Sequence, residues 1–195
     1  MTQPLVFYLS SMFDVKALYN RYYPEGEALT TLVWNHCKQV ADLAHDIAVT
    51  HPHLDIDLDF LYEAAMLHDI GVYATHAPSI LCMGSEPYLR HGIIGAELLR
   101  AEGMEAHARV CERHIGVGLT ATDIATQQLP LPEQDMLPET MEEKLICYAD
   151  NYFSKSHPTH MRTYTQVRNG VARFGEENLM RFDELATLFG RINDI

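Results

Sequence analysis

AAMLHDIG, the stretch formed by residues 64–71, determines how the rest of the sequence is interpreted. Ala64, Ala65 and His68 recur at helical spacing with Leu61, so the side chain of His68 is expected to face the core. Asp69 follows directly, and Gly71 is expected to end the helix as a left-handed C-terminal cap. A buried imidazole beside a buried carboxylate needs a partner, and a divalent cation binds both. The stretch therefore predicts a metal site at a helix end.

A His-Asp dipeptide is a weak signal by itself, because a chain with 11 histidines contains such pairs by chance. A second pair, His45-Asp46, lies in a segment whose apolar stripe includes His36, and residue 45 is about half a turn away from that stripe. We expect His45 and Asp46 to be exposed to solvent. The assignment of His68 and Asp69 then depends on the apolar run, the glycine and further ligands from elsewhere.

Composition indicates one globular domain. The 195 residues are 47% hydrophobic, and no linker divides them, so we predict a single domain over 1–195. We see neither a signal peptide nor a membrane anchor, which favours a cytoplasmic protein. The four widely spaced cysteines are expected to be reduced and packed in the core; they are Cys37, Cys82, Cys111 and Cys147.

The net charge of −13 and the pI near 5.1 argue against a nucleic-acid groove, which would carry a basic stripe. A small anionic, phosphate-containing substrate stays compatible with this charge where a metal supplies the positive field. No membrane association is expected, and the sequence leaves homodimer formation open.

Almost every segment is expected to be helical, and no run shows the sustained alternation of a half-buried strand. The expected fold class is all-α, a helical bundle with additional C-terminal helices. Helices are expected from a cap at Ser10 or Ser11 to before Pro24, over about 28–49, from a cap at Asp57 or Asp59 to His68, over about 88–101, 105–115 and 123–127, from the Thr140 capping box to Phe153, and over about 162–174 and 177–189. Residues 72–87 are expected to form a long loop of the kind that often serves as a lid.

Four more polar residues occupy apolar stripes, namely His36, His91, His114 and Asp150. A lone histidine on such a face is more often a hydrogen-bonded core residue than a ligand. Six inward-facing imidazoles and carboxylates from five helices, however, would leave several buried polar groups unsatisfied unless a cation lies between them.

The other histidines compete for these roles. His107 lies seven residues before His114 on the same helical face, so it is an alternative to His114 or a neighbour of the ligands. The remaining ones lie near prolines or in expected loops and are interpreted as surface residues: His51, His53, His76, His157 and His160.

The order His36, His68-Asp69, His91, His114, Asp150 resembles the HD superfamily of metal-dependent phosphohydrolases, and residues 68–71 match the HDIG form of its motif. The resemblance implies an HD-domain-like helical bundle with a core over about residues 28–155 and the N-terminal and C-terminal helices packed on this core. It implies that His36, His68, Asp69 and Asp150 hold one divalent metal. It further implies that His91, His114 and a bridging Asp69 hold a second. The ions would be Fe, Mn, Co, Ni or Zn.

The resemblance also implies an activity, the hydrolysis of a phosphate ester or anhydride in a small nucleotide-like metabolite, with Asp69 and His68 as catalytic residues. Arg90, Arg113 and Lys155 are the cations expected to balance phosphate charge, although no spacing chooses among them. Two departures from the family pattern matter. Val72 replaces the lysine that often follows the HDIG glycine, and no glycine-tyrosine-proline element follows His114, so a cyclic-di-GMP substrate is not favoured.

Two other functions fit almost the same ligand set. One is an HD-type mixed-valence di-iron oxygenase, which iron dependence and oxygen consumption would distinguish. The other is a non-catalytic metal-dependent sensor or binding module, which the complete set of six ligand positions disfavours.

Overall fold

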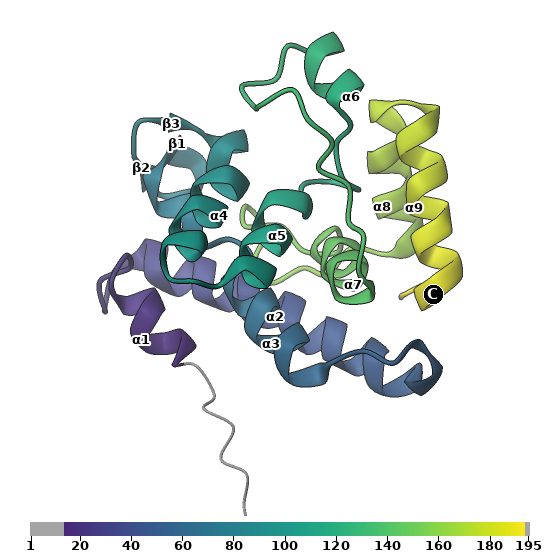
Figure 1. The fold of residues 1–195 in the computed structure, drawn as a ribbon, viewed down its shortest axis with the longest axis horizontal. Coiled ribbons are helices and arrows are strands. Elements are labelled where there is room, and N and C mark those ends of the chain that lie inside the picture. The colour runs from purple at the N-terminus through teal and green to yellow at the C-terminus, as the bar shows by residue number, and fades with distance from the viewer. Residues whose placement is uncertain (1–13, 194–195) are drawn as a thin grey trace, which may run out of the picture.

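The computed structural model describes residues 14–193, and most of them lie in helices (Figure 1). This confirms the predicted fold class. The α-helices are α1 (Val15–Asn20), α2 (Ala28–Thr50), α3 (Leu58–Leu67), α4 (His91–Ala101), α5 (Glu105–Arg113), α6 (Ala121–Thr126), α7 (Met141–Asp150), α8 (Tyr164–Val171) and α9 (Glu176–Phe189). No helix of the described residues is long and apolar enough to cross a membrane.

The helix starts follow from local capping chemistry. The Asp57 side chain accepts a hydrogen bond from the Phe60 amide at 3.0 Å and begins α3, as predicted. Thr140 and Glu143 form the predicted capping box of α7, each side chain accepting from the other residue's backbone amide. The predicted caps Ser10 and Ser11 lie outside the described residues. The first described helix, α1, is capped by Asp14, whose side chain accepts a hydrogen bond from the Ala17 amide.

The prediction of a long loop over 72–87 was wrong. This segment contains three short strands, β1 (Thr75–Ala77), β2 (Cys82–Met83) and β3 (Glu86–Pro87), in the order β2-β1-β3, with β1 antiparallel to β2 and parallel to β3. Strands of two or three residues are too short to show alternation in sequence, and their pairing is not local. The small sheet therefore had no detectable signal.

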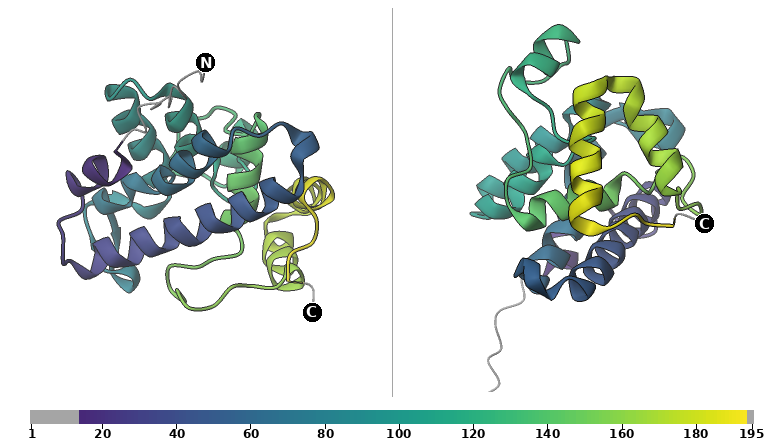
Figure 2. Two further views of the ribbon diagram at one scale, coloured as in Figure 1. Left: turned by 90° about the horizontal axis from the view of Figure 1, so that it is seen from below. Right: turned by 90° about the vertical axis from the view of Figure 1, so that its right-hand side faces the viewer.

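The core is centred on the packing of α2 against α3, with α5 and α7 also against α3. Leu61, Leu67 and Val33 are fully buried there, and Tyr148 on α7 connects this core to Phe182 on α9. Figure 2 shows the long α2 running along one face of the molecule and the α8–α9 pair at one flank. α6 projects from the helical body at the end of a long connection in Figure 1 and in the right-hand view of Figure 2.

Candidate metal centre

Six predicted ligands come together from five helices, and most of them stand at helix ends. His36 lies within α2, His68 and Asp69 directly follow α3, His91 is the first residue of α4, His114 directly follows α5, and Asp150 is the last residue of α7. All but Asp150 are buried, and the Asp150 side chain is 20% exposed. Segments separated by more than 100 residues thus converge on one point.

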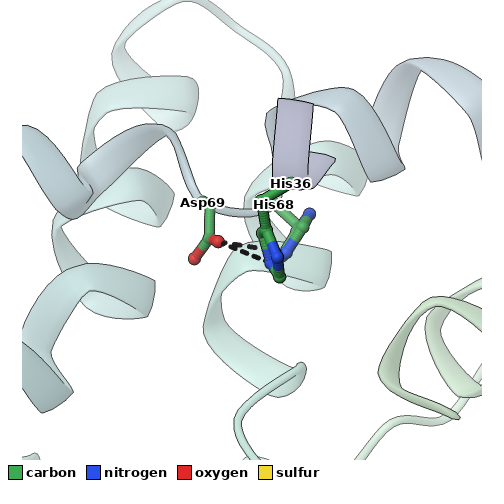
Figure 3. A group of neighbouring side chains, drawn as sticks. All are labelled: His36, His68 and Asp69. Carbon is green, nitrogen blue, oxygen red and sulfur yellow. Dashed lines mark ion pairs between the residues drawn. The ribbon is translucent and has the colours of Figure 1, made fainter. Parts of the chain in front are cut away.

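Asp69 is the centre of this cluster, because each of its carboxylate oxygens faces a different pair of imidazoles. Oδ2 lies 3.2 Å from Nε2 of His36 and 3.3 Å from Nε2 of His68. Figure 3 marks ion pairs between these three residues with dashed lines. Oδ1 lies 3.3 Å from Nε2 of His91 and 3.7 Å from Nε2 of His114. The carboxylate therefore divides the cluster into two half-sites.

The first half-site consists of His36, His68, Asp150 and Oδ2 of Asp69. Oδ1 of Asp150 lies 2.9 Å from Nε2 of His36 and 3.5 Å from Nε2 of His68, so two carboxylates and two imidazoles converge there. The second half-site consists of His91, His114 and Oδ1 of Asp69, and the Nε2 atoms of the two histidines are 3.0 Å apart.

Backbone carbonyls fix the orientation of three of the four rings. Nδ1 of His68 donates to the Ala65 carbonyl at 2.6 Å, and Nδ1 of His91 and of His114 donates to the carbonyl three residues earlier at 2.7 Å each. Because a carbonyl can only accept, each Nδ1 carries a proton and each Nε2 is turned toward Asp69. Metal-binding histidines are oriented in this way.

The cluster satisfies the requirements of a divalent metal. Nε2 of His68 and Oδ1 of Asp69 are buried and have no hydrogen-bond partner among the described residues. In the second half-site, two neutral rings whose Nδ1 atoms are protonated direct lone pairs at each other across 3.0 Å. A cation is the group that accepts lone pairs from all of these atoms. Each half-site contains a set of three ligand atoms within 4.8 Å of one another.

Charge is distributed unequally between the half-sites. Burial opposes ionisation of Asp69, but the Lys155 ammonium and the His68 imidazole outweigh it and hold the pKa of its carboxyl well below its usual range. Burial likewise works against the protonation of His68, but the negative charge of Asp69 raises its pKa well above 6.5. Burial lowers the pKa of His91, and burial together with His68 and His91 lowers that of His114 to about 3. The second half-site is therefore neutral at its imidazoles.

Lys155 is the cation that reaches the centre. Its Nζ contacts Oδ2 of Asp69 and lies 3.1 Å from Nε2 of His36. It also lines a pocket of about 270 Å³ that opens beside the first half-site, together with Tyr88, Asp150 and the three serines Ser79, Ser154 and Ser156. A bound phosphate in this pocket would have an ammonium and hydroxyl donors within reach.

The other two predicted cations lie elsewhere. Nε of Arg90 is 3.1 Å from a carboxylate oxygen of Glu86, and Arg113 donates to Glu139 and to the Leu137 carbonyl, both at 2.6 Å. Neither lines the pocket beside the first half-site. His107 is also outside the cluster, where it packs edge-on against Phe60 and lies 3.6 Å from Glu63.

Most of the histidines predicted at the surface are exposed to solvent. The side chains of His45 and Asp46 are 43% and 84% exposed. His53, His76, His157 and His160 are exposed, and His51 is half-buried. The facing of His68 therefore distinguished a buried His-Asp pair from an exposed one.

Gly71 has a different role from the one predicted. It lies inside a 3-10 helix over Ile70–Ala74, and its φ is not in the left-handed region, so it is not a C-terminal cap. A Cβ at this position would overlap the carbonyl oxygen of His91 and come within 2.5 Å of the Gly95 amide nitrogen. The glycine is needed because the backbone of the HDIG turn packs directly against α4, which carries His91.

Sequence reasoning missed the residue that holds this turn. Tyr23 is buried, and its hydroxyl lies 3.3 and 3.2 Å from the carbonyls of Asp69 and Ile70, while it accepts a hydrogen bond from the Tyr73 amide at 3.0 Å. The neighbouring Tyr22, by contrast, is only half-buried. The short α1 and the turn after it gave no periodicity that could separate the two.

The comparisons with known proteins agree with this geometry. The HD domain family model matches residues 33–154, and the chain belongs to this family, whose members include metal-dependent hydrolases. No solved structure gives a significant match to the chain.

Three curated relatives are about one third identical to this chain. An uncharacterized protein of Methanocaldococcus jannaschii is 36% identical over 122 residues, which are 61% of this chain and 64% of that protein. Two proteins named tRNA (cytidine(56)-2'-O)-methyltransferase, from Thermoplasma volcanium and Picrophilus torridus, are 34% and 33% identical over 62% and 67% of this chain. The chain spans only 31% and 34% of the length of those two proteins.

Proposed function

We propose that this protein is a metal-dependent hydrolase of phosphate esters or anhydrides that acts on a small nucleotide-like metabolite. The observation that carries the proposal is the division of Asp69 between two half-sites, one of which opens onto a pocket containing Lys155 and three serines. A carboxylate shared by two sets of imidazoles is the arrangement expected of a two-metal hydrolase.

The ligands divide between two ions. His36, His68, Asp69 and Asp150 would hold the first, and Asp69, His91 and His114 the second. Imidazole and carboxylate ligands accept Fe, Mn, Co, Ni or Zn, so metal identity is set by geometry and availability. When bound, such ions lower the pKa of a water molecule and stabilise phosphoryl oxygens during in-line attack.

The remaining roles belong to the side chains. Asp69 would accept a hydrogen bond from the attacking water and so orient it, while the ring of His68 keeps its place through the Ala65 carbonyl. Lys155 would leave Asp69 for a phosphate oxygen of the substrate, because the bound ions neutralise the carboxylate that it now contacts. Among the three predicted cations, Lys155 is favoured because it alone lines this pocket.

The size and chemistry of the pocket favour a small substrate. Its volume of about 270 Å³ is at or below the low end for ligand pockets, and its lining is rich in hydroxyl groups. This fits a phosphate with a small attached group better than a polymer. The activities named for the two methyltransferase relatives are not part of the proposal, because this chain spans about one third of those proteins.

A phosphate-release panel with matched metal analysis tests the proposal. The protein is purified aerobically and anaerobically, its metals are quantified, and nucleotides, sugar phosphates and pyrophosphate are offered with each metal. Metal-dependent release is expected, and Lys155→Gln should lower kcat/KM by about tenfold or more, whereas Lys38→Gln, an exposed control on α2, should not change it.

Two results would contradict the proposal. Oxygen consumption without phosphate release in the iron form would indicate the oxygenase. Tight metal binding with neither reaction on any substrate would indicate the sensor or binding module.

A further inference from the structure

A second, larger pocket lies on another side of the segments that carry the metal ligands. It has a volume of about 780 Å³, within the usual range of small-molecule sites. One wall consists of residues 115–117 after α5 and of Asn151 after α7. The opposite wall consists of α8 and the following turn, with Arg162, Arg173 and Phe174. These three residues lie beyond residues 33–154, the part matched by the HD family.

The charge of this pocket is opposite to that of the protein. The chain has 27 acidic and 14 basic residues, yet no carboxylate is among the described residues that line the pocket. Arg162 donates to the Asn151 carbonyl at 3.3 Å and forms no ion pair with a described carboxylate, and neither does Arg173. Two arginines without acidic partners in a strongly acidic protein favour an anionic ligand.

The pocket also presents an aromatic ring at its edge. The side chain of Phe174 is 67% exposed, an unfavourable state for a large apolar group. Its backbone is fixed by Asn178, a buried residue of α9 that donates to the Phe174 carbonyl at 3.0 Å. Val167 and Val171, both largely buried, also line the pocket. A planar ring of a ligand could stack on Phe174 while its anionic group meets an arginine.

The two pockets are separate but adjacent. They have no lining residue in common, yet consecutive residues face each of them: Tyr88 and Asp150 line the pocket at the metal centre, while Leu89 and Asn151 line the larger one. Nδ2 of Asn151 also donates to the Gly116 carbonyl at 2.5 Å, two residues after His114. The larger pocket is thus distinct from the metal centre.

We propose that the pocket between α8 and residues 115–117 is a second ligand site, which binds a small organic anion carrying an aromatic ring, of the class of a nucleoside monophosphate. The proposal does not depend on the function proposed for the metal centre. It rests on two arginines that form no ion pair with a described carboxylate, the exposed Phe174 and a pocket of suitable size.

Equilibrium binding to the full chain tests this proposal. Adenosine 5′-monophosphate is titrated by calorimetry in the presence of EDTA, which prevents turnover, with adenosine and inorganic phosphate as probes that carry only one of the two features. The monophosphate is expected to bind about tenfold or more tightly than either probe.

Matched variants locate the site. Arg162→Gln combined with Arg173→Gln, and separately Phe174→Ala, should raise the Kd by about tenfold. The control for the double arginine variant is Arg21→Gln combined with Lys38→Gln, which removes the same charge from exposed positions and should leave the Kd unchanged. The control for Phe174→Ala is Met180→Ala, which truncates another exposed apolar side chain and should also leave the Kd unchanged. Lys155→Gln, which removes the cation of the other pocket, should also leave the Kd unchanged.

Circular dichroism and thermal unfolding establish that each variant is folded. The absence of saturable binding at millimolar monophosphate would overturn the proposal. So would binding that Lys155→Gln weakens while the arginine and Phe174 variants do not, because the ligand would then occupy the pocket at the metal centre. Neither result would decide whether the metal centre hydrolyses phosphate, which is measured separately.

Discussion

The two half-sites share one carboxylate but differ in how their charge is balanced. In the first, Asp150 and Oδ2 of Asp69 are compensated by Lys155 and by a His68 whose pKa is raised. In the second, burial keeps His91 and His114 neutral, and no cation of the described residues contacts them. A metal must therefore displace a proton and an ammonium from the first half-site. The second half-site presents free lone pairs at neutral pH.

Asp69 is the residue common to both half-sites, so its loss should have the largest effect. Asp69→Ala is expected to remove both metals and to lower activity by roughly 100-fold or more, since even residues that only support a ligand contribute 10- to 100-fold. Metal analysis and the phosphate-release assay measure this. Asp69→Asn, which keeps the shape of the side chain, serves as a second variant.

His45→Ala is the matched control for this prediction, because it alters the exposed His-Asp pair. It should retain metal and activity. Retention of both metals by Asp69→Ala would show that the carboxylate does not join the half-sites.

The double variant His91→Ala/His114→Ala separates the half-sites. It should lose the second metal and keep the first, so that the metal content falls from about two per chain to about one. The expectation follows from Oδ1 of Asp69, which faces only these two histidines. An unchanged single metal in both proteins would make His91 and His114 ordinary core or substrate-facing residues.

The sequence predicted which side chains face inward better than it predicted the contacts between elements. Helical spacing alone placed His68 inward and His45 outward, because the facing of a long amphipathic helix is a local property. The role of Gly71 was misassigned, since the need for glycine comes from the approach of α4, a contact with no local signal. The Arg90 side chain is directed by its ion pair with Glu86, and the Arg113 side chain by its ion pair with Glu139, which is 26 residues away in the sequence.

The coupling between the turn and α4 gives the next prediction. Gly71→Ala should destabilise the fold by about 3 kcal/mol, because the added methyl group would overlap backbone atoms of α4 and the whole helix would have to shift to make room. Displacement of His91 should weaken the second metal more than the first. Urea denaturation and metal titration measure the two effects.

Gly170→Ala is the control, since this glycine of α8 has no atom within 4 Å of an added Cβ. It should be neutral or should stabilise the protein by up to about 1 kcal/mol. A Gly71→Ala protein of normal stability and metal content would mean that α4 does not rely on this close packing.

The smallest expected effect concerns pH, and it distinguishes the half-sites in the metal-free protein. Histidine has a pKa near 6.5 in unfolded chains, so below this value the unfolded state binds protons that buried His91 and His114 do not, and stability falls as the pH falls. For His114 the loss is about 2 kcal/mol between pH 6.5 and pH 5. His68 has the opposite sign: its raised pKa stabilises the fold below pH 6.5, and this contribution is lost as the pH rises through its folded value.

Stability of the EDTA-treated protein should therefore be greatest near pH 6.5, and urea denaturation at pH 5, 6.5 and 8 measures it. His114→Gln should reduce the loss on the acid side by about 2 kcal/mol, while the loss on the alkaline side should persist because His68 is intact. Half-buried His107 also has a pKa lowered by desolvation, but it contributes equally to both proteins and cancels in the comparison. Asp69 and Asp150 hold their protons only below the range tested, because their pKa values lie well below the usual one. Equal acid-side losses in the two proteins would mean that His114 takes up a proton in the fold. The imidazoles of the second half-site would then not be neutral in the metal-free protein.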